Sequence, residues 1–148
     1  MCIRDSLEYY SKPQRMAQAR ALRALHGDYR AQALAPPENS RDGSPFQGKV
    51  HTAEAILCGD FNLEAHEPEY AELTRAGAGD TLHDSWRLLH GAAPHAPTFR
   101  LFDRTYGPDP IACDFVFVSE GLKDKVRSLA IDAATRVSDH QPVAVELG

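Results

Sequence analysis

The sequence predicts a single α/β domain, in which helices cover a sheet of short strands. Strong helix-forming residues fill positions 13–25, and a second helical pattern begins at Glu67. Short runs of β-branched and aromatic residues follow in the second half, most densely at positions 113–118. Apolar helices combined with apolar strands are typical of a layered α/β architecture, and a length of 148 residues suits one domain.

The first helix has recognisable start and stop signals. Ser11 suits the N-cap position, and Pro13 falls in the first turn, where its missing N–H costs nothing. The pair His26-Gly27 predicts the end of the helix. A strand end is expected at positions 7–10, immediately before the helix. The basic residues between positions 12 and 30 are expected to lie on a solvated helix face.

The rest of the chain alternates between loops and short apolar runs. Many Pro, Gly, Ser and Asn residues at positions 35–48 predict a long loop. An apolar run at positions 53–58 predicts a buried strand that ends at Gly59-Asp60. The remaining expectations are a short helix or turn at 82–89, a loop at 90–97, and strands at 98–102, 113–118, 126–131 and 143–147.

Composition narrows the function classes. A net charge of −5 argues against non-specific binding to duplex DNA, because such proteins need a basic face to neutralise phosphates. No apolar stretch approaches the roughly 20 residues that cross a bilayer, and the first residues do not resemble a signal peptide, so a cytoplasmic location is expected. Cys2, Cys58 and Cys113 fit no metal-binding spacing and are expected to be small buried residues in a reducing compartment.

Three short segments place polar residues at the ends of apolar runs. They are residues 59–62 (Gly-Asp-Phe-Asn), Asp114 at the start of its strand, and residues 138–143 (Ser-Asp-His-Gln-Pro-Val). A carboxylate buried at a strand edge costs several kcal/mol unless it is paired or bound to a metal. Each segment alone is typical of a turn or a loop. Together, three aspartates and a histidine suit the binding of a divalent cation near a phosphate.

In this order the three segments resemble signature motifs of the endonuclease/exonuclease/phosphatase family. That family includes DNase I-like nucleases, abasic-site endonucleases, sphingomyelinases and inositol polyphosphate 5-phosphatases. The resemblance extends over residues 7–148, which we expect to form a partial domain, whereas residues 1–6 match nothing in it. It implies part of a four-layer α/β sandwich (DNase I-like), in which two sheets pack face to face between helices.

The resemblance also implies roles for four residues. Asp60 would position or activate the attacking water, and Asn62 would bind a phosphate oxygen. Asp114 would orient His140 through a hydrogen bond. His140 would contact the phosphoryl group and stabilise charge in the transition state. Such roles suit phosphoryl transfer, which depends on positioning and charge neutralisation more than on covalent chemistry.

Two further residues are candidates for binding the cofactor and the substrate. By the same resemblance Asp139 would help to hold the metal or orient the water. Mg²⁺ (or Mn²⁺) is the expected ion because hard oxygen ligands select hard cations. Arg104 is a candidate phosphate contact, although a surface ion pair explains it equally well.

The chain departs from the family at its beginning. The family domain is much longer, and its first half carries an Asn, a metal-binding Glu, and a His or Tyr that this sequence lacks. Asp5-Ser6 stand where the His or Tyr is expected, so we expect a C-terminal half whose natural chain extends upstream. Without the first half, an apolar sheet face and an unpaired edge would be exposed, which predicts low stability, aggregation or dimerisation.

Three functions remain open from the sequence. The first is a metal-dependent phosphoesterase, whose substrate is a phosphodiester or phosphomonoester, with nucleic acid possible but not favoured by the charge. The second is a catalytically dead fragment that binds phosphorylated ligands or a partner protein. The third is an unrelated hydrolase that uses scattered histidines, such as His90 and His95, to bind zinc. Trp86 is expected in the core rather than as a platform for a base.

Overall fold

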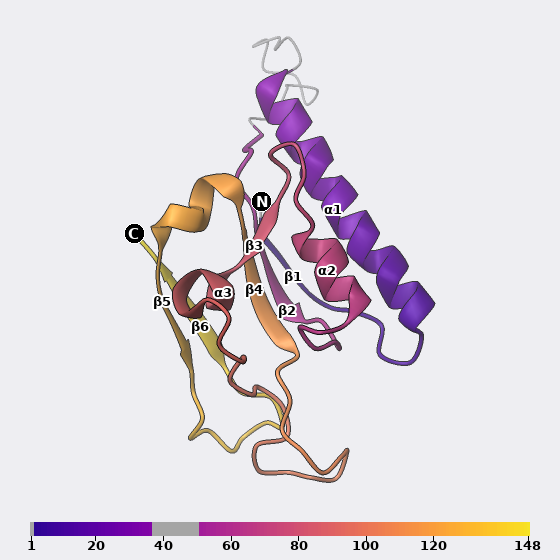
Figure 1. Cartoon of the computed structure of the whole chain (residues 1–148), viewed down its shortest axis with the longest axis vertical. Helices are drawn as coiled ribbons and strands as arrows, with labels where there is room; N and C mark the ends of the chain where they lie inside the picture. Colours follow the sequence, from indigo (N-terminus) through magenta and orange to yellow (C-terminus); the bar gives the residue numbers. More distant parts are fainter. Residues whose placement is uncertain (1, 37–50) are drawn as a thin grey trace, which may run out of the picture.

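The computed structural model describes residues 2–36 and 51–148, with side chains from residue 6 onward. Three layers are visible in Figure 1: helices α1 (Lys12–Leu34) and α2 (Pro68–Thr74), a four-stranded sheet, and a two-stranded sheet. The mixed α/β class predicted from the sequence is therefore confirmed. The loop predicted at positions 35–48 lies mostly outside the described residues.

The four-stranded sheet has the order β1-β2-β4-β3. Strand β1 (Cys2–Ser6) runs parallel to β2 (Ile56–Asp60), whereas β4 (Asp114–Ser119) is antiparallel to both β2 and β3 (Leu82–Asp84). The register of β2 and β4 places Asp60 opposite Asp114. The last residue of one strand and the first of the other thus bring two of the predicted site residues to the same edge of the sheet.

The main core lies between this sheet and the helices α1 and α2. Phe117 in the central strand is fully buried, and its ring meets that of Phe61 edge-on at 5.0 Å between centroids. Burying such a side chain contributes about 1.5–3 kcal/mol to stability. The buried members of this cluster are Leu7, Ala19, Leu57, Phe61, Leu63, Tyr70, Leu73, Leu82, Phe115 and Phe117.

Helix α1 begins as predicted but ends later. The Ser11 side chain accepts a hydrogen bond from the Gln14 backbone N–H, which confirms the predicted N-cap. The predicted stop at His26-Gly27 is wrong, because the helix continues to Leu34. A glycine inside a helix costs about 1 kcal/mol. Tertiary contacts on both sides offset this cost, since Arg23 and Arg30 donate to the carbonyls of Glu72 and Ala78, each at 2.9 Å.

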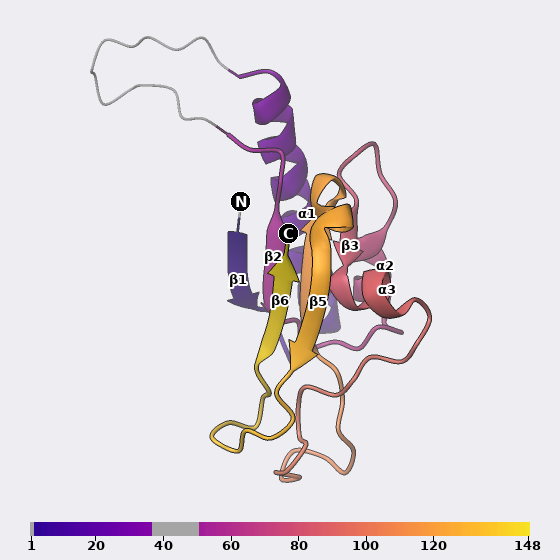
Figure 2. The same cartoon turned by 90° about the vertical axis from the view of Figure 1, so that its left-hand side faces the viewer.

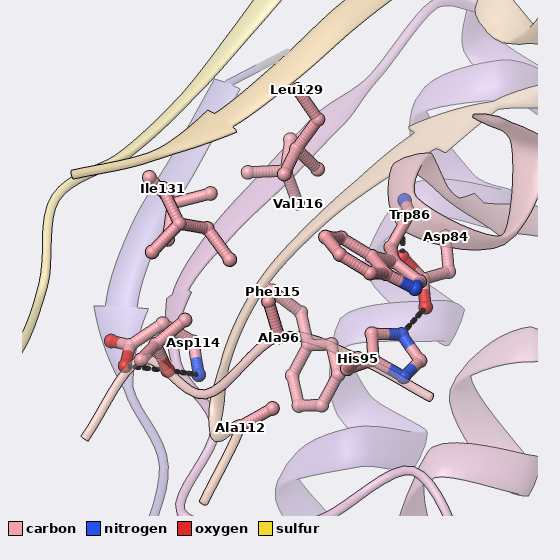
Figure 3. A pocket seen from close by; sticks show the side chains of 12 residues that line it. Asp84, Trp86, His95, Ala96, Ala112, Asp114, Phe115, Val116, Leu129 and Ile131 are labelled. Carbon is pink, nitrogen blue, oxygen red and sulfur yellow. Dashed lines mark hydrogen bonds and ion pairs between the residues drawn. The ribbon is translucent and has the colours of Figure 1, made fainter. Parts of the chain in front are cut away.

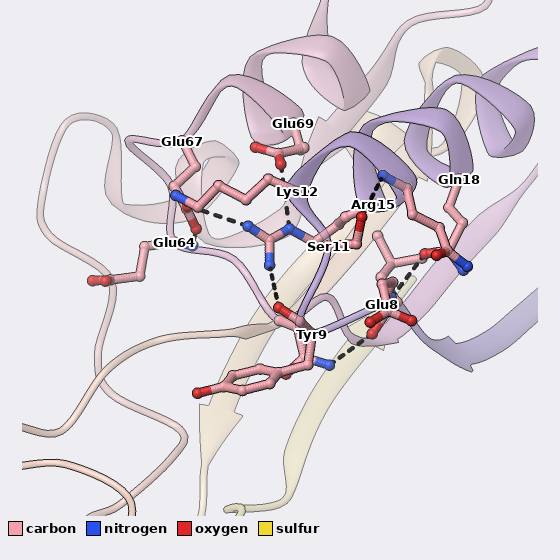
Figure 4. Close-up of polar contacts among 12 residues, drawn as sticks. Glu8, Tyr9, Ser11, Lys12, Arg15, Gln18, Glu64, Glu67 and Glu69 are labelled. Atoms are coloured by element: carbon pink, nitrogen blue, oxygen red, sulfur yellow. Dashed lines mark hydrogen bonds and ion pairs between the residues drawn. The ribbon is translucent and has the colours of Figure 1, made fainter.

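The basic residues of α1 are not all solvated, contrary to expectation. Arg15 is only 3% exposed, and its guanidinium contacts Glu67 at 3.3 Å and Glu69 at 3.4 Å, as Figure 4 shows. Burial opposes ionisation of Glu67, but hydrogen bonds from the Lys12 ammonium and the Glu64 N–H lower the pKa of this carboxyl overall. The network ties the start of α1 to the loop that follows Asp60.

Several predicted strands need correction. The strand predicted at residues 7–10 is wrong, because β1 comprises Cys2–Ser6, which the sequence had left unmatched. The strand predicted at 53–58 begins and ends later, as β2, and so includes Asp60. The strand predicted at 98–102 is wrong, because Phe99 forms only isolated bridges, with Ile111 and His140. Backbone pairing across the sheet, rather than local composition, decides these boundaries.

The remaining elements follow the prediction more closely. The segment 82–89 forms β3 and the short helix α3 (Ser85–His90). The strand predicted at 113–118 appears as β4, followed by the 3-10 helix η1 (Glu120–Lys125). The predictions for β5 (Val126–Ile131) and β6 (Val143–Leu147) are confirmed at both ends.

The antiparallel pair β5–β6 covers the sheet face opposite α1 and α2, as Figure 2 shows. Leu129, Ile131 and Val143 from this pair line a cavity together with Val116 of β4. Most residues of β5 and β6 are half-buried or exposed, which accords with a second layer that is only two strands wide in the described residues. No helix in the described ranges is long and apolar enough to cross a membrane.

Candidate active site

The candidate site lies where β2 ends and β4 begins. The Phe61 N–H donates to the Cys113 carbonyl at 2.8 Å and so continues the β2–β4 pairing past Asp60. The side chains of Asp60 and Asp114 therefore start from adjacent strands at one edge of the sheet. Residues 138–140 reach the same edge, because Phe99 bridges to both Ile111 and His140.

Asp114 and His140 form a direct pair. The Nδ1 atom of His140 lies 3.0 Å and 3.2 Å from the two carboxylate oxygens of Asp114. The pair is partly open, with 31% of the His140 side chain and 17% of the Asp114 side chain exposed. A carboxylate at one ring nitrogen fixes the tautomer and orientation of the imidazole and leaves the other nitrogen available. This contact was expected from the sequence, and the structure contains it.

Thr98 holds this pair in place, and the sequence reasoning did not single it out. Its buried hydroxyl donates to Asp114 Oδ2 at 2.6 Å and accepts from the N–H groups of Cys113 and Asp114. The Thr98 carbonyl accepts from the Gln141 N–H at 2.7 Å. Because these contacts link residues 16 and 43 positions apart in the chain, no local sequence signal identifies them.

The ring of Phe99 supports His140 from one side. The two rings stack with 4.5 Å between their centroids and an interplanar angle of 30°. The Arg100 guanidinium lies 5.2 Å from the centre of the Phe99 ring. The imidazole is thus positioned by a carboxylate at its edge and by an aromatic ring on its face.

Asp60 and Asn62 form a tight turn after β2. Asp60 Oδ1 accepts from the Asn62 N–H at 2.8 Å, and Asn62 adopts a left-handed backbone conformation with φ of 51°, which asparagine tolerates better than most residues. The Asn62 amide nitrogen donates to the Leu7 carbonyl at 2.7 Å and to the Ser6 hydroxyl at 3.2 Å. In this structure the Asn62 side chain therefore links the turn to the end of β1.

Cys113 completes the cluster, although sequence reasoning had assigned it a packing role only. One potential metal-ligand atom from each of Asp60, Cys113 and His140 lies within 4.8 Å of the other two. Burial raises the pKa of the Cys113 thiol, and the charges of Asp114 and Asp60 raise it further. Burial also raises the pKa of Asp60, although the hydrogen bond from the Asn62 N–H opposes this effect. The missed signal was adjacency to Asp114, since only cysteine–cysteine spacings had been considered.

The structure does not bring Asp139 and Arg104 into this cluster. The Asp139 carboxylate accepts from the Ser138 hydroxyl at 3.4 Å, and its backbone carbonyl accepts from the Arg100 N–H. Arg104 lies in an exposed loop, where its guanidinium donates to the Pro108 carbonyl. The roles predicted for these two residues remain predictions.

Comparison with protein-family models gives one match, to the endonuclease/exonuclease/phosphatase family over residues 6–140. No curated protein sequence matches the chain.

Solved structures share the fold. A mannosyl-6-phosphatase from Bacteroides thetaiotaomicron matches with 22% identity and a TM-score of 0.64, over 99% of this chain and 50% of that one. A truncated Caenorhabditis elegans TDP2 matches with 22% identity and a TM-score of 0.64, over 99% and 54%. A functionally unknown conserved protein from Enterococcus faecalis has 21% identity and a TM-score of 0.66, over 99% and 49%. The chain thus spans about half the length of these solved chains.

Proposed function

The chain belongs to the endonuclease/exonuclease/phosphatase family, and from this premise we propose that it takes part in the hydrolysis of phosphoric esters by attack of water on phosphorus. The observation that carries this proposal is the convergence of the Asp114–His140 pair with Asp60 at one sheet edge. An imidazole held by a carboxylate, next to a second carboxylate, offers a proton donor and a proton acceptor on a single surface.

His140 is the proposed contact to the phosphoryl group. Its Nδ1 is engaged by Asp114, so Nε2 is the ring nitrogen that remains to meet a substrate oxygen. A hydrogen bond from this nitrogen to a non-bridging oxygen would stabilise the charge that develops there. Because Phe99 and Asp114 hold the ring, little reorganisation is needed during the reaction.

Asp60 is proposed to accept a proton from the attacking water. Its raised pKa makes the ionised carboxylate a better proton acceptor than an ordinary surface aspartate. Its Oδ1 is oriented by the Asn62 N–H. Asn62 serves this arrangement as the residue that fixes the turn, while its proposed contact to a phosphate oxygen needs the amide to leave Ser6 and Leu7.

The metal expected for this reaction is Mg²⁺, or Mn²⁺, with Asp139 as a ligand. Mg²⁺ prefers six oxygen ligands in a regular octahedron. The ligand cluster of the described residues offers one oxygen, one nitrogen and one sulfur instead, and it does not include Asp139. These residues do not by themselves form a Mg²⁺ site, so no step above is assigned to the ion.

The substrate is proposed to be a small phosphoric ester rather than duplex DNA. The net charge of −5 disfavours the broad phosphate contacts that duplex binding needs. One structural neighbour is named a mannosyl-6-phosphatase, and this name supports a small phosphorylated compound as the substrate. Arg104 is proposed as a further phosphate contact, which requires its guanidinium to release the Pro108 carbonyl.

Hydrolysis of bis-p-nitrophenyl phosphate with Mg²⁺ or Mn²⁺ tests the proposal. We expect the activity of the chain to fall by at least about a hundredfold in His140→Ala, the scale that general acid–base groups supply. His90→Ala is the matched control, because His90 is exposed on α3 and is not a member of the Asp60–Cys113–His140 cluster. Equal activity in His140→Ala would refute the assigned role.

The alternative function is binding without catalysis, and one observation favours it. The cluster found in the described residues is not an oxygen-rich Mg²⁺ ligand set. We expect hydrolysis in this family to need such a set. Folded chain with no activity under either metal, together with saturable binding of a phosphorylated ligand that His140→Ala weakens, would replace the enzymatic proposal with this one.

A further inference from the structure

We propose that Asp60, Cys113 and His140 form a binding site for a thiophilic divalent cation, in the first place Zn²⁺. The site overlaps the proposed catalytic residues without using the oxygen-rich ligands that Mg²⁺ prefers. Occupation by Zn²⁺ therefore blocks hydrolysis, a consequence that rests on the proposed function, whereas the binding itself does not.

The spacing of the three side chains suits one ion. Their ligand atoms lie within 4.8 Å of one another. Tetrahedral zinc with bonds of about 2.0–2.3 Å separates neighbouring ligand atoms by about 3.3–3.8 Å. A cluster at this limit has to contract by about 1 Å to hold the ion. Three protein ligands leave a fourth position open, as in zinc sites that bind water or substrate.

The chemistry of the ligands selects the ion. A sulfur, an imidazole nitrogen and a single carboxylate are the ligand types that zinc combines, whereas magnesium binds oxygen. The proton on the Cys113 thiol is displaced when a metal binds, as occurs with coordinating thiols in general. Because Asp60 and Asp114 flank this thiol, the local negative charge attracts a cation.

His140 is already oriented as zinc-binding histidines are. Such histidines donate a hydrogen bond from one ring N–H to a carboxylate and bind the metal through the other ring nitrogen. The Asp114 carboxylate lies 3.0 Å from Nδ1 of His140, and the Thr98 hydroxyl donates to Asp114 at 2.6 Å. Nε2 is thus the nitrogen that would bind the ion, with a carboxylate and a hydroxyl ordered behind it.

The backbone around Cys113 is rigid enough to hold a metal. Its N–H donates to the Thr98 hydroxyl at 3.2 Å, and its carbonyl accepts from the Phe61 N–H at 2.8 Å. The residue is 2% exposed, while Asp60 and His140 are partly open to solvent and give an ion access. A sulfur ligand on a fixed strand end, beside two more accessible ligands, restricts the ion to a defined position.

Binding at this position would remove both proposed catalytic functions at once. Zn²⁺ on Nε2 of His140 prevents that atom from donating to a phosphoryl oxygen. Zn²⁺ on the Asp60 carboxylate prevents it from accepting a proton from water. The bound ion and the arrangement needed for hydrolysis should therefore exclude each other. Inhibition by Zn²⁺ should also depend on the sulfur of Cys113.

Cobalt(II) is the probe for the test, because Co²⁺ occupies zinc sites and gives a near-ultraviolet charge-transfer band when a thiolate binds it. We expect titration of the chain with Co²⁺ to produce this band, and added Zn²⁺ to abolish it. In Cys113→Ser the band disappears, and the Zn²⁺ dissociation constant rises at least about tenfold, the effect of losing a metal-site contact. Cys58→Ser is the matched control and keeps the band, because Cys58 is a half-buried β2 residue outside the cluster.

The outcomes separate this site from the proposed function. A band that persists in Cys113→Ser, or one that requires Cys58 instead, overturns the zinc site whatever the hydrolysis assay gives. A Cys113-dependent band in a chain without hydrolytic activity supports the zinc site. The same result counts against the phosphoesterase proposal alone. Circular dichroism checks the fold of Cys113→Ser, and His140→Ala, which also loses a ligand, provides a second variant that must weaken Co²⁺ binding.

Discussion

Two aspartate–histidine pairs flank β4, and they differ mainly in burial. Asp114 and His140 lie at the open end of the strand, with 17% and 31% of their side chains exposed. Asp84 and His95 lie deeper, with 2% and 9% exposed. Figure 3 shows Asp114 and the Asp84–His95 pair on opposite sides of the same pocket, with Phe115 between them.

Both carboxylate oxygens of the buried pair are engaged. Asp84 Oδ2 lies 2.5 Å from His95 Nε2 and accepts from the Tyr70 hydroxyl at 2.6 Å, while Oδ1 accepts from the Trp86 N–H at 2.8 Å. The His95 ring stacks on Trp86 with 5.7 Å between centroids. Burial and the hydrogen bond to Asp84 raise the pKa of Tyr70, so its hydroxyl stays a donor.

Similar aspartate–histidine pairs thus serve different purposes according to the residues that surround them. Asp84 caps α3 and connects it to α2 and to the loop of His95, so its pair stabilises the fold. Asp114 orients an imidazole that is 31% exposed and lies in one cluster with Asp60 and Cys113. We expect replacement of the first pair to cost stability and, under the proposed function, replacement of the second to cost chiefly binding or activity.

The largest expected effect is on stability at the buried pair. Asp84→Ala leaves Tyr70, His95 and the first turn of α3 without their shared acceptor, so the free energy of unfolding should fall by about 3 kcal/mol. Asp114→Ala removes a more exposed acceptor and should cost about 1 kcal/mol. Urea denaturation of both variants measures the difference, and equal losses would break the comparison.

A smaller effect is expected from the hydroxyl that supports the open pair. Thr98→Val keeps the shape of the side chain but leaves two backbone N–H groups and Asp114 without this partner. The expected loss is about 2 kcal/mol in the free energy of unfolding. Thr98→Ser retains the hydroxyl and should lose less than half as much. If the two variants unfold at the same denaturant concentration, the hydroxyl does not support the pair as described.

The smallest expected effect concerns a third histidine, which has no aspartate partner. His26 in α1 is 1% exposed, and neither ring nitrogen has a hydrogen-bond partner within the described residues. Burial lowers the pKa of His26 below 6.5, although the charge of Asp80 opposes this shift, and Arg30 lowers the pKa further. The unfolded chain therefore binds the proton more tightly, so stability is retained above pH 6.5 and declines as the pH falls toward the lowered value.

His26→Gln should show a shallower decline over the same pH range, because glutamine does not titrate. Thermal melting of both proteins between pH 7.5 and pH 5 measures the two slopes, with about pH 6.5 as the onset for an ordinary histidine. Parallel slopes would mean that other groups cause the acid sensitivity. A steeper slope in the variant would contradict the assigned sign.

The sequence predicted the parts of this molecule that depend on local signals. The Ser11 cap, β5, β6 and the Asp114–His140 contact were all anticipated, the last from the order of three short motifs. The continuation of α1 through Gly27 was missed, because arginine contacts to distant loops offset the local cost of glycine.

The candidate site was predicted only in part, for a similar reason. The apolar runs next to Asp60 and Asp114 were predicted as strands, and the pairing of β2 with β4 brings the two residues to one edge. Thr98 joins them through contacts that no spacing in the sequence reveals, whereas Cys113 was signalled only by its position next to Asp114. His95 appeared as a possible zinc ligand in the sequence, whereas in the structure its Nε2 is committed to Asp84. Partners distant in the chain thus decided each of these outcomes.

The position of β4 also decides when the four-stranded sheet can assemble. β4 lies between β2 and β3, yet it follows both in the chain, and β3 pairs with no other strand among the described residues. Synthesis proceeds from the N-terminus, so the flanking strands leave the ribosome before the strand that joins them. Sheets closed by contacts distant in sequence also form slowly. A translational pause before residue 114 would therefore hold back the strand that pairs with both β2 and β3.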